Sequence, residues 1–297
     1  MPKSQFDSHL HHGPLASRLI GALFVALGLV LALLAPTCLS AAPNCPPPPS
    51  MKDRLQNAPT ADDYTDLGVW FAGHDQYDCA ADAFATALQA KPPDKYVPHL
   101  IFMFGSSLYL SGDLQEAIPA LQEAEHRGYK DNRLHLMLAA ALDALSTDLV
   151  NDADYPSVIE LLDKPRVQPQ RTPTQCANLA TAYERTGKPG QALEVLRNGL
   201  NTSPESAEVA GQLAALLVRS SRDEEAASVL EIALTRNPDD PRLHEAFGTV
   251  LARLNRMPEA REHLERAIAL GDTSPDAKSN LAKVIQALGA APQSLSP

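Results

Sequence analysis

A self-similarity with a period of 34 residues constrains the fold of this chain more than any other feature. When the segment from Thr174 to Pro204 is shifted by this period once and then again, apolar and small residues fall on the same positions without a gap. The matched positions are Leu179-Ala180, Tyr183, Ala192, Leu196 and Pro204, then Leu213-Ala214, Leu217, Ala226, Leu230 and Pro238, then Phe247-Gly248, Leu251, Ala260 and Leu264. A period of this length is typical of repeat architectures, in which each unit buries its apolar faces against its neighbours.

The same pattern recurs upstream of these three units. It reads Tyr64, Leu67-Gly68, Phe71, Ala80, Phe84, Ala87 and Pro92 from residue 61, and Ile101, Phe104-Gly105, Leu108, Ala117, Leu121 and Ala124 from residue 98. The order of large residue, Leu-Gly, aromatic, Ala, Phe, Ala and Pro resembles the tetratricopeptide repeat family. The resemblance implies an all-α fold, a right-handed superhelical solenoid of about six helix-turn-helix repeats with a C-terminal capping helix.

Each repeated position has a physical role in such a unit. Gly68, Gly105 and Gly248, with alanines at the other units, let the first helix of a unit approach its second helix closely. Alanines of the second helix do the same from the other side, and the large residues such as Phe84 fill the space against the next unit. Proline ends several units because its ring removes a helix hydrogen bond and clashes with the preceding turn.

The spacing places a repeat domain at residues 58–289, with units near 61–94, 98–131, 132–172, 173–206, 207–240 and 241–274 and a cap at 275–289. The third unit is irregular. Residues 132–145 predict its first helix and residues 155–164 its second, with 146–154 as an intervening insertion and 165–173 as an extended, proline-containing connector. Residues 290–297 predict a disordered tail.

Composition agrees with close-packed helices and excludes one class of ligand. Hydrophobic residues make up 44% of the chain but aromatic residues only 5%, and Ala and Leu, which favour helices, supply most of the apolar content. The formal net charge is −11. Nucleic-acid binding needs clustered Lys and Arg to neutralise phosphates, so the sequence predicts no nucleic-acid partner.

Residues 1–42 predict an export signal or an uncleaved signal anchor. Lys3 and Arg18 precede an uncharged apolar run from Leu19 to Leu34, and small residues and a proline-rich linker at 43–57 follow. The run is shorter than the ~20 residues of a spanning helix, which favours cleavage. The expected location is therefore periplasmic or extracellular. Anchoring through residues 19–35 is the alternative, and only then would the protein contact a membrane.

Export would place the cysteines in a compartment that permits disulfides. A bond between Cys45 and Cys79 is conceivable, although the sequence slightly favours leaving both unpaired. Cys176 falls on a helix face that should be buried, where a thiol behaves as a small hydrophobic group.

The family resemblance also implies where a partner would bind, namely the concave groove formed mainly by first helices. The implied groove positions are His99, Phe102, Ser106, Tyr109, Arg133, Leu136, Asp143, Thr181, Glu184, Arg185, Glu208, Arg219, Arg242, Glu245 and Arg253. Phe102 and Tyr109 predict an aromatic contact patch, with ordinary inter-repeat packing as the alternative. Arg185, Arg219 and Arg253 recur every 34 residues and predict a ladder for an acidic peptide, with a solvated or Glu-paired face as the alternative.

Catalytic and metal-binding patterns are weak. His244-Glu245 begins like a zinc-protease motif but lacks the second His. Asp148, Asn151, Asp152 and Asp154 do not have EF-hand spacing, which favours a solvated acidic loop. The family's chaperone-tail subfamily grips a terminal carboxylate with Lys and Asn, but the first unit has Thr65 and Val69 at those positions.

The sequence therefore predicts a non-catalytic scaffold that binds a partner protein or peptide in the groove of its solenoid, without metal or cofactor. A membrane-tethered assembly factor of the cell envelope is one alternative. An enzymatic or solute-binding role is the weaker one.

Overall fold

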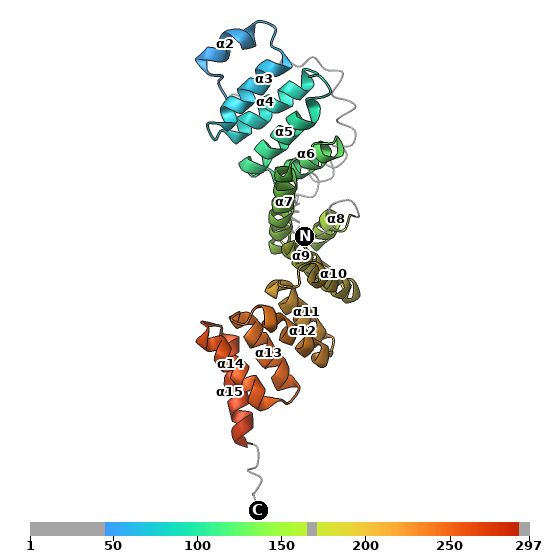
Figure 1. Cartoon of the computed structure of the whole chain (residues 1–297), viewed down its shortest axis with the longest axis vertical. Coiled ribbons are helices and arrows are strands. Elements are labelled where there is room, and N and C mark those ends of the chain that lie inside the picture. The colour runs from blue at the N-terminus through green and yellow to red at the C-terminus, as the bar shows by residue number, and fades with distance from the viewer. Residues whose placement is uncertain (1–44, 165–170, 291–297) are drawn as a thin grey trace, which may run out of the picture. The chain divides into compact units, whose positions relative to one another are not determined.

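The computed structural model describes residues 45–164 and 171–290 (Figure 1), and in these residues every regular element is an α-helix. The repeats belong to the unit that begins at Pro47. The helices are α2 (Pro49–Gln56), α3 (Ala61–Ala72), α4 (Tyr77–Gln89), α5 (Val97–Ser111), α6 (Leu114–His126), α7 (Asn132–Asn151), α8 (Tyr155–Leu162), α9 (Pro173–Arg185), α10 (Pro189–Thr202), α11 (Ala207–Arg219), α12 (Asp223–Arg236), α13 (Pro241–Arg253), α14 (Met257–Ala269) and α15 (Pro275–Ala290).

Three predicted segments fall partly or wholly outside the described residues. They are the signal or anchor segment at 1–42, most of the connector at 165–173, and the tail at 290–297, of which only Ala290 is described, as the last residue of α15. Among the described helices, none combines the length and apolarity needed to cross a bilayer.

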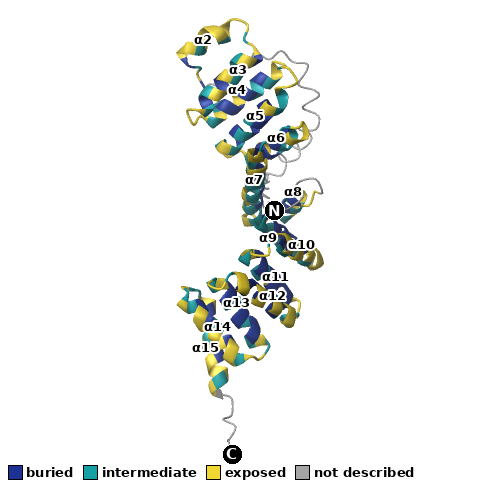
Figure 2. Ribbon diagram, viewed as in Figure 1, coloured by how far each residue is buried: buried dark blue, intermediate teal, exposed yellow. Residues whose placement is uncertain are grey.

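Helices α3 to α14 form pairs in chain order, and α15 follows as a seventh first helix. Each helix contacts its pair partner and the next helix along the chain. First helices also contact one another in succession from α5 through α7, α9, α11 and α13 to α15. Buried residues lie where helices face their neighbours (Figure 2). The predicted all-α solenoid of helix-turn-helix repeats is confirmed.

Five first helices follow a residue whose side chain accepts a hydrogen bond from the first turn, whereas Tyr96 before α5 forms no such bond. Thr60, Asp131, Thr172, Ser206 and Asp240 serve as N-caps for α3, α7, α9, α11 and α13. Such caps satisfy backbone N–H groups that have no partner inside the helix. Local sequence chemistry therefore fixes where these five helices start.

The small residues bring the two helices of a unit together as expected. A Cβ atom added to Gly68 would lie 2.5 Å from Cε1 of Phe84, and one added to Gly248 would lie 2.7 Å from Cγ of Leu264. The second-helix alanines are fully buried: Ala80, Ala117, Ala192, Ala226 and Ala260. Only small residues fit between helices this close, because a larger group would overlap the facing side chain.

The turn between the two helices of each unit contains one residue with a left-handed backbone. These residues are Asp75, Gly112, Ala153, Gly187, Ser221 and Asn255, with φ between 57° and 91°. A left-handed residue after a helix ends it and reverses the chain. Glycine occupies two of the six positions, so the turn recurs although its residue type does not.

Helix α7 corrects the prediction for the third unit. The expected insertion at 146–154 is not a loop, because α7 continues without interruption to Asn151. Ser146 is fully buried, and Asp148 and Asn151 lie on this helix rather than in an acidic loop. The spacing of 41 between the third and fourth unit starts exceeds the usual 34 by seven residues, or about two helical turns. Two added turns return the helix to nearly the same face.

The ends of α7 pack against different units. Near its start, the Arg133 guanidinium lies 5.9 Å from the ring of Phe102 on α5. Further along, Ala139 and Asp143 accept hydrogen bonds from the Gln175 side chain on α9. The helix thus contacts the unit before it and the unit after it, as the other inner first helices do.

Helix α8 is shorter than the other second helices and ends at Leu162. Pro165 follows within three residues, where it would oppose further helix. The guanidinium of Arg171 donates to the Leu162 carbonyl at 2.9 and 3.1 Å, so it caps the end of α8. The Tyr183 hydroxyl donates to Asp163 at 2.6 Å, and burial together with this carboxylate raises the pKa of Tyr183 to about 12.

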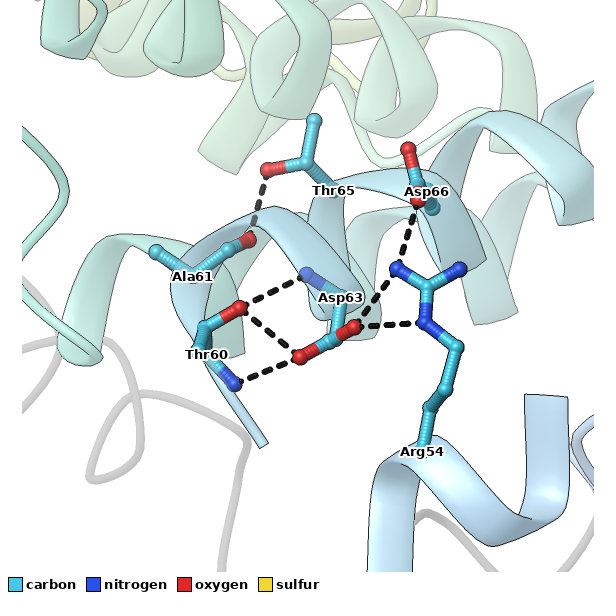
Figure 3. A network of polar contacts seen from close by, with 6 residues as sticks. All are labelled: Arg54, Thr60, Ala61, Asp63, Thr65 and Asp66. Atoms are coloured by element: carbon cyan, nitrogen blue, oxygen red, sulfur yellow. Dashed lines mark hydrogen bonds and ion pairs between the residues drawn. The ribbon is translucent and has the colours of Figure 1, made fainter. Parts of the chain in front are cut away.

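Helix α2 was not expected, since residues 43–57 were predicted as linker. It begins with Pro49, which suits a first helical turn, and it has no buried residue. Arg54 joins it to α3 through hydrogen bonds to Asp63 and Asp66 at 2.8 and 2.9 Å (Figure 3). Asp63 also accepts from the Thr60 backbone and hydroxyl, and these bonds, with Arg54, lower the pKa of the Asp63 carboxyl.

The cysteines differ from expectation in one respect. Cys45 and Cys79 are both disulfide-bonded, so the prediction that they stay unpaired is wrong. Cys176 is a free thiol and is 4% exposed, as expected. Burial raises the pKa of the Cys176 thiol, which makes it a packing residue rather than a reactive one.

A histidine pair joins the two helices of the sixth unit. His244 on α13 is buried, its Nε2 lies 2.9 Å from the Pro238 carbonyl, and its Nδ1 lies 2.9 Å from Nδ1 of His263 on α14. The Pro238 carbonyl only accepts, so Nε2 of His244 donates to it. In a neutral His244 the other ring nitrogen, Nδ1, then accepts from Nδ1 of His263. Burial, then the neighbouring His244, lower the pKa of His263, which favours its neutral form.

The close approach at Gly68 gives the first prediction. Gly68→Ala should lower the free energy of unfolding by about 1–3 kcal/mol, because the added Cβ displaces the buried Phe84 ring. Gly211→Ala in the middle of α11 is the matched control. Nothing lies within 4 Å of its added Cβ, so it should stabilise by about 0.5–1 kcal/mol. Urea unfolding of both variants measures this, and equal effects would contradict the packing account.

The histidine pair gives the second prediction. Since the pKa of His263 is lowered from 6.5 in the fold, the unfolded chain binds more protons just below that pH. The free energy of unfolding should fall as pH drops from about 7.5 to 5.5, by at most about 1.4 kcal/mol per pH unit for one proton. His263→Gln should flatten this dependence, while His126→Gln at an exposed position should follow the wild type. A His263→Gln curve parallel to wild type would refute the assignment.

Candidate functional site

The first helices present the most accessible large apolar side chains. The first helices of the repeats together form one side of the stack of helices. We call this side, formed by α3, α5, α7, α9, α11, α13 and α15, the first-helix face. Among the described residues, Val69 on α3 and Leu110 on α5 are 50% exposed, and Leu136 on α7 is 70% exposed. Ile285 on α15 is 47% exposed. Elsewhere only Tyr96, before α5, and Ile232, on α12, are comparable, so exposed apolar area concentrates on this face.

The predicted aromatic patch is only partly accessible. Phe102 is 6% exposed and stacks on Tyr129 with 4.4 Å between ring centroids, so for this residue inter-repeat packing is the correct reading. Tyr109 is half-buried and packs against the core. A partner would therefore reach Tyr109 but not the Phe102 ring. Leu110, the residue after Tyr109, and Leu136 on the next first helix expose more apolar surface.

The predicted arginine ladder is partly engaged within the protein. Arg219 forms an ion pair with Glu184 at 2.6 Å, and Arg253 forms one with Asp223 at 2.9 Å. Each pair links a first helix to the preceding unit. Exposed pairs of this kind contribute little to stability, but they occupy the guanidinium donors. Arg185 is exposed, and within the described residues its side chain makes no ion pair or hydrogen bond. Of the three, it is the one whose guanidinium is wholly unengaged by the described residues, whereas Arg219 and Arg253 use Nε and Nη2 in their ion pairs.

A polar network that the sequence did not reveal joins α7 to α9. Asp143 accepts hydrogen bonds from the Thr172 hydroxyl at 2.6 Å and the Gln175 amide at 2.7 Å. Asn178 donates to the hydroxyls of Ser146 and Thr147 at 2.9 and 3.0 Å. Within the described residues no buried side-chain donor or acceptor lacks a partner. The network is therefore satisfied internally, which indicates a structural role.

An equivalent bond occurs at the last junction. Asn280 on α15 donates to the Thr249 hydroxyl on α13 at 3.1 Å. Asn178 and Asn280 hold the same position in their repeats, since each directly precedes a Leu-Ala pair. The shared signal in the sequence is an asparagine on one first helix and a hydroxyl residue on the preceding one.

A pocket opens beside this second asparagine. It has a volume of about 260 Å³ and is lined by Thr249, Ala252 and Arg253 of α13, Met257 of α14, and Asn280, Lys283 and Val284 of α15. Of the predicted site residues, only Arg253 belongs to it. Its walls are mainly apolar, with two cationic side chains among the lining residues.

The described residues offer no metal site of the expected kinds. In residues 45–164 and 171–290, no three His, Cys, Asp or Glu side chains are grouped so as to hold a metal ion. His244, from the partial zinc-protease motif, is instead bonded to His263 and to a backbone carbonyl. Glu245 beside it has a raised pKa because of burial and then the nearby Asp272 and Asp276.

Comparisons with known proteins address the family. No curated protein sequence matches the chain. Among solved structures, the first TPR domain of human RPAP3 is 21% identical, covers 40% of this chain and 93% of its own, and gives a TM-score of 0.38. A thermophilic TPR protein from Thermus thermophilus is 18% identical over 76% of this chain and 100% of its own, with a TM-score of 0.35. A tetratricopeptide repeat protein from Parabacteroides merdae is 14% identical over 76% and 98%, with a TM-score of 0.42.

Two family models match the chain directly, and both describe the tetratricopeptide repeat. One matches residues 149–293 and the other residues 102–147, which together make up more than half of the chain. The boundary between them falls within α7, the long first helix of the third unit. With the stacked helix pairs and the small residues between them, these matches show that the chain belongs to the tetratricopeptide repeat family.

Proposed function

We propose that this protein is a non-catalytic scaffold that binds a segment of a partner protein on its first-helix face. The tetratricopeptide repeat fold points to a protein-interaction scaffold, and proteins of this family are generally non-catalytic. The observation that carries the proposal is the exposure of Val69, Leu110 and Leu136 on three successive first helices. Apolar side chains that gather on one face of a fold mark interaction sites, and these three lie on successive helices of one face.

The contact chemistry follows from these side chains. Leu136, at 70% exposure, would bury the largest additional apolar area on binding. A few central residues usually supply most of the binding free energy at an interface, and the rest exclude water. We place Leu136 in that central role, with Val69, Leu110 and Tyr109 as supporting contacts. Arg185, whose donors are unoccupied within the described residues, extends the surface toward an acidic part of the partner.

The experiment compares two exposed apolar positions. Leu136→Glu on α7 should reduce capture of native partners at least tenfold, about 1.4 kcal/mol, because a carboxylate replaces the central apolar contact. Ile232→Glu on α12 is the matched control, since Ile232 is 56% exposed on a second helix. Quantitative affinity capture from native cells with both folded variants and wild type provides the measurement. Equal capture by all three proteins would reject the first-helix face as the binding surface.

We also propose that the protein is exported and that its N-terminal segment is removed. The apolar run after Arg18 and the disulfide-bonded state of Cys45 and Cys79 support this location, because disulfides persist in oxidising compartments. N-terminal sequencing of protein from native cells should find a first residue near Ala42. An N-terminus before Leu19 would favour the membrane-tethered alternative instead.

A further inference from the structure

Helix α15 leaves open the side that a second helix covers in the other repeat units. Its main contacts are with α13 and α14. Ile285 is 47% exposed, whereas the residues at the same repeat position in the units before it are at most 7% exposed. These residues are Phe71, Leu108, Leu142, Tyr183, Leu217 and Leu251. Ala282 is also exposed, although Gly248, one period earlier, is buried. We call Lys278, Ala282 and Ile285 the open side of α15.

The open side is separate from the surface proposed above. Leu136 is the fifth residue of α7 and Val69 the ninth residue of α3, and positions four apart share one side of a helix. Ile285 is the eleventh residue of α15. The ninth and eleventh positions are ~200° apart around a helix, so they point to nearly opposite sides.

The second helices of the other units show what the open side accepts. Most of them carry a buried large residue, with one buried small residue four positions before it and another three positions after it. The sets are Ala80-Phe84-Ala87, Ala117-Leu121-Ala124, Ala192-Leu196-Gly199, Ala226-Leu230-Ala233 and Ala260-Leu264-Ala267. The large residue packs at the position that Ala282 holds, because a Cβ atom added to Gly248 would lie 2.7 Å from Cγ of Leu264. A helix that covers the open side needs this pattern.

The open side also carries an unengaged charge. Lys278 is exposed, and among the described residues its ammonium makes no ion pair or hydrogen bond. One period earlier, Nδ1 of His244 lies 2.9 Å from Nδ1 of His263, the residue before Leu264. The residue just before the large residue of a covering helix would therefore lie beside Lys278. A Glu or Asp at that place would form a charge-assisted hydrogen bond with the ammonium.

A second copy of this chain offers no such helix within the described residues. Helices α2 and α15 lie outside the six pairs. In neither helix does a large apolar residue have Ala or Gly both four positions before it and three positions after it. The second helices that carry the pattern are buried in their own units, so a second copy would have to open a unit to supply one. This inventory favours a helix from another protein.

We propose that α15 binds an amphipathic helix of a partner protein, which takes the place of a second helix in the seventh unit. The partner helix runs antiparallel to α15, as helices joined by a short turn do. It places its large apolar residue against Ala282 and Ile285 and an acidic residue beside Lys278. A single 16-residue helix offers a small surface relative to the ~800 Å² per partner of a stable interface, so we expect weak binding. This contact is additional to the first-helix face and does not depend on it.

Binding of a labelled peptide to the full chain tests the proposal. The probe has the sequence of α14, Met257–Ala269, with His263→Glu. It also carries Arg261→Lys, joined to Glu265 by a lactam on the polar side, because so short a helix is marginal in water. A second peptide adds Leu264→Ala. Fluorescence polarisation should show saturable binding of the first peptide and at least about tenfold weaker binding of the second, which lacks the large apolar contact. Equal binding of the two, or no saturable binding of the first, would overturn the proposal.

Variants of the full chain assign the binding to the open side. Ile285→Glu should weaken binding of the first peptide at least about tenfold, because a carboxylate would have to be buried in place of an apolar contact. Gln286→Glu is the matched control, since Gln286 is the next residue of α15, is exposed and gains the same charge. It should change binding less than about twofold at physiological salt. Thermal melting checks that both variants fold. Equal losses in the two variants would overturn the assignment.

The charge contact has a separate test. Lys278→Gln should weaken binding of the peptide with His263→Glu about fivefold, but that of a peptide which keeps His263 less than about twofold. Lys283→Gln is the control, because Lys283 is exposed on the same helix but lines the pocket toward α13. Equal losses of the two peptides in Lys278→Gln would contradict the acidic residue beside Lys278.

Two further outcomes test the other possible occupant and the other surface. In sedimentation, wild type and Ile285→Glu should behave alike; a wild-type dimer that Ile285→Glu dissociates would mean that a second copy covers the open side, and would overturn the proposal. Leu136→Glu should leave peptide binding unchanged, because Leu136 lies on α7. Peptide binding lost in Leu136→Glu but kept in Ile285→Glu would place the peptide on the first-helix face instead. Normal peptide binding with partner capture unaffected by Leu136→Glu would reject the first-helix face and leave the open side standing.

Discussion

The close contact between the two helices of each unit is the constraint on which the rest of the structure depends. Gly68 lies against the Phe84 ring, and Gly248 against Leu264, at distances that leave no space for a further carbon atom. Each contact sets how far apart the helices of a unit lie. That distance determines which residues of the unit stay uncovered and must be buried by the next unit. The packing of one unit therefore influences the packing of its neighbour.

First helices carry this propagation, because they contact one another in succession from α5 to α15. Their side chains have two tasks: one side packs on the second helix of the unit, and the opposite side is left for solvent or a partner. The exposed Val69, Leu110 and Leu136 lie on these helices. Helix α7 keeps the row continuous across the irregular third unit, because its seven additional residues make two turns and preserve the buried side.

Much of the fold could be predicted from the sequence, since the repeat period and the N-cap residues are local signals. Unit starts, the small residues at helix contacts and the buried Cys176 all follow from them. The α7 extension could not be predicted, because residues 146–151 contain Ser, Thr, Asp and Asn, which are common in loops. Their helix is stabilised by tertiary contacts, such as the bonds from Asn178 to Ser146 and Thr147. Helix α2 escaped prediction for a similar reason, as it has no buried residue and is joined to α3 by Arg54.

The candidate site was harder to predict than the fold. Whether its side chains are accessible depends on their partners in the structure, and the repeat spacing of the sequence does not show these partners. Three arginines share one repeat position: Arg185, Arg219 and Arg253. Arg219 pairs with Glu184 and Arg253 with Asp223. The repeat spacing does not indicate which of the three arginines form ion pairs. The repeat pattern places Phe102 among the groove residues, but in the structure Tyr129 stacks on its ring and buries it. The pocket at α13 to α15 combines residues of three helices, and only their packing brings Ala252, Met257 and Val284 together.

Site-specific photo-crosslinking in native cells tests the central claim most directly. A photoreactive amino acid would replace Leu136 on a first helix and, in a second protein, Ile232 on a second helix; both positions are more than half exposed. The first-helix face predicts a discrete crosslinked partner from position 136 and none from position 232. The same partner crosslinked equally at both positions, or at position 232 alone, would contradict the account.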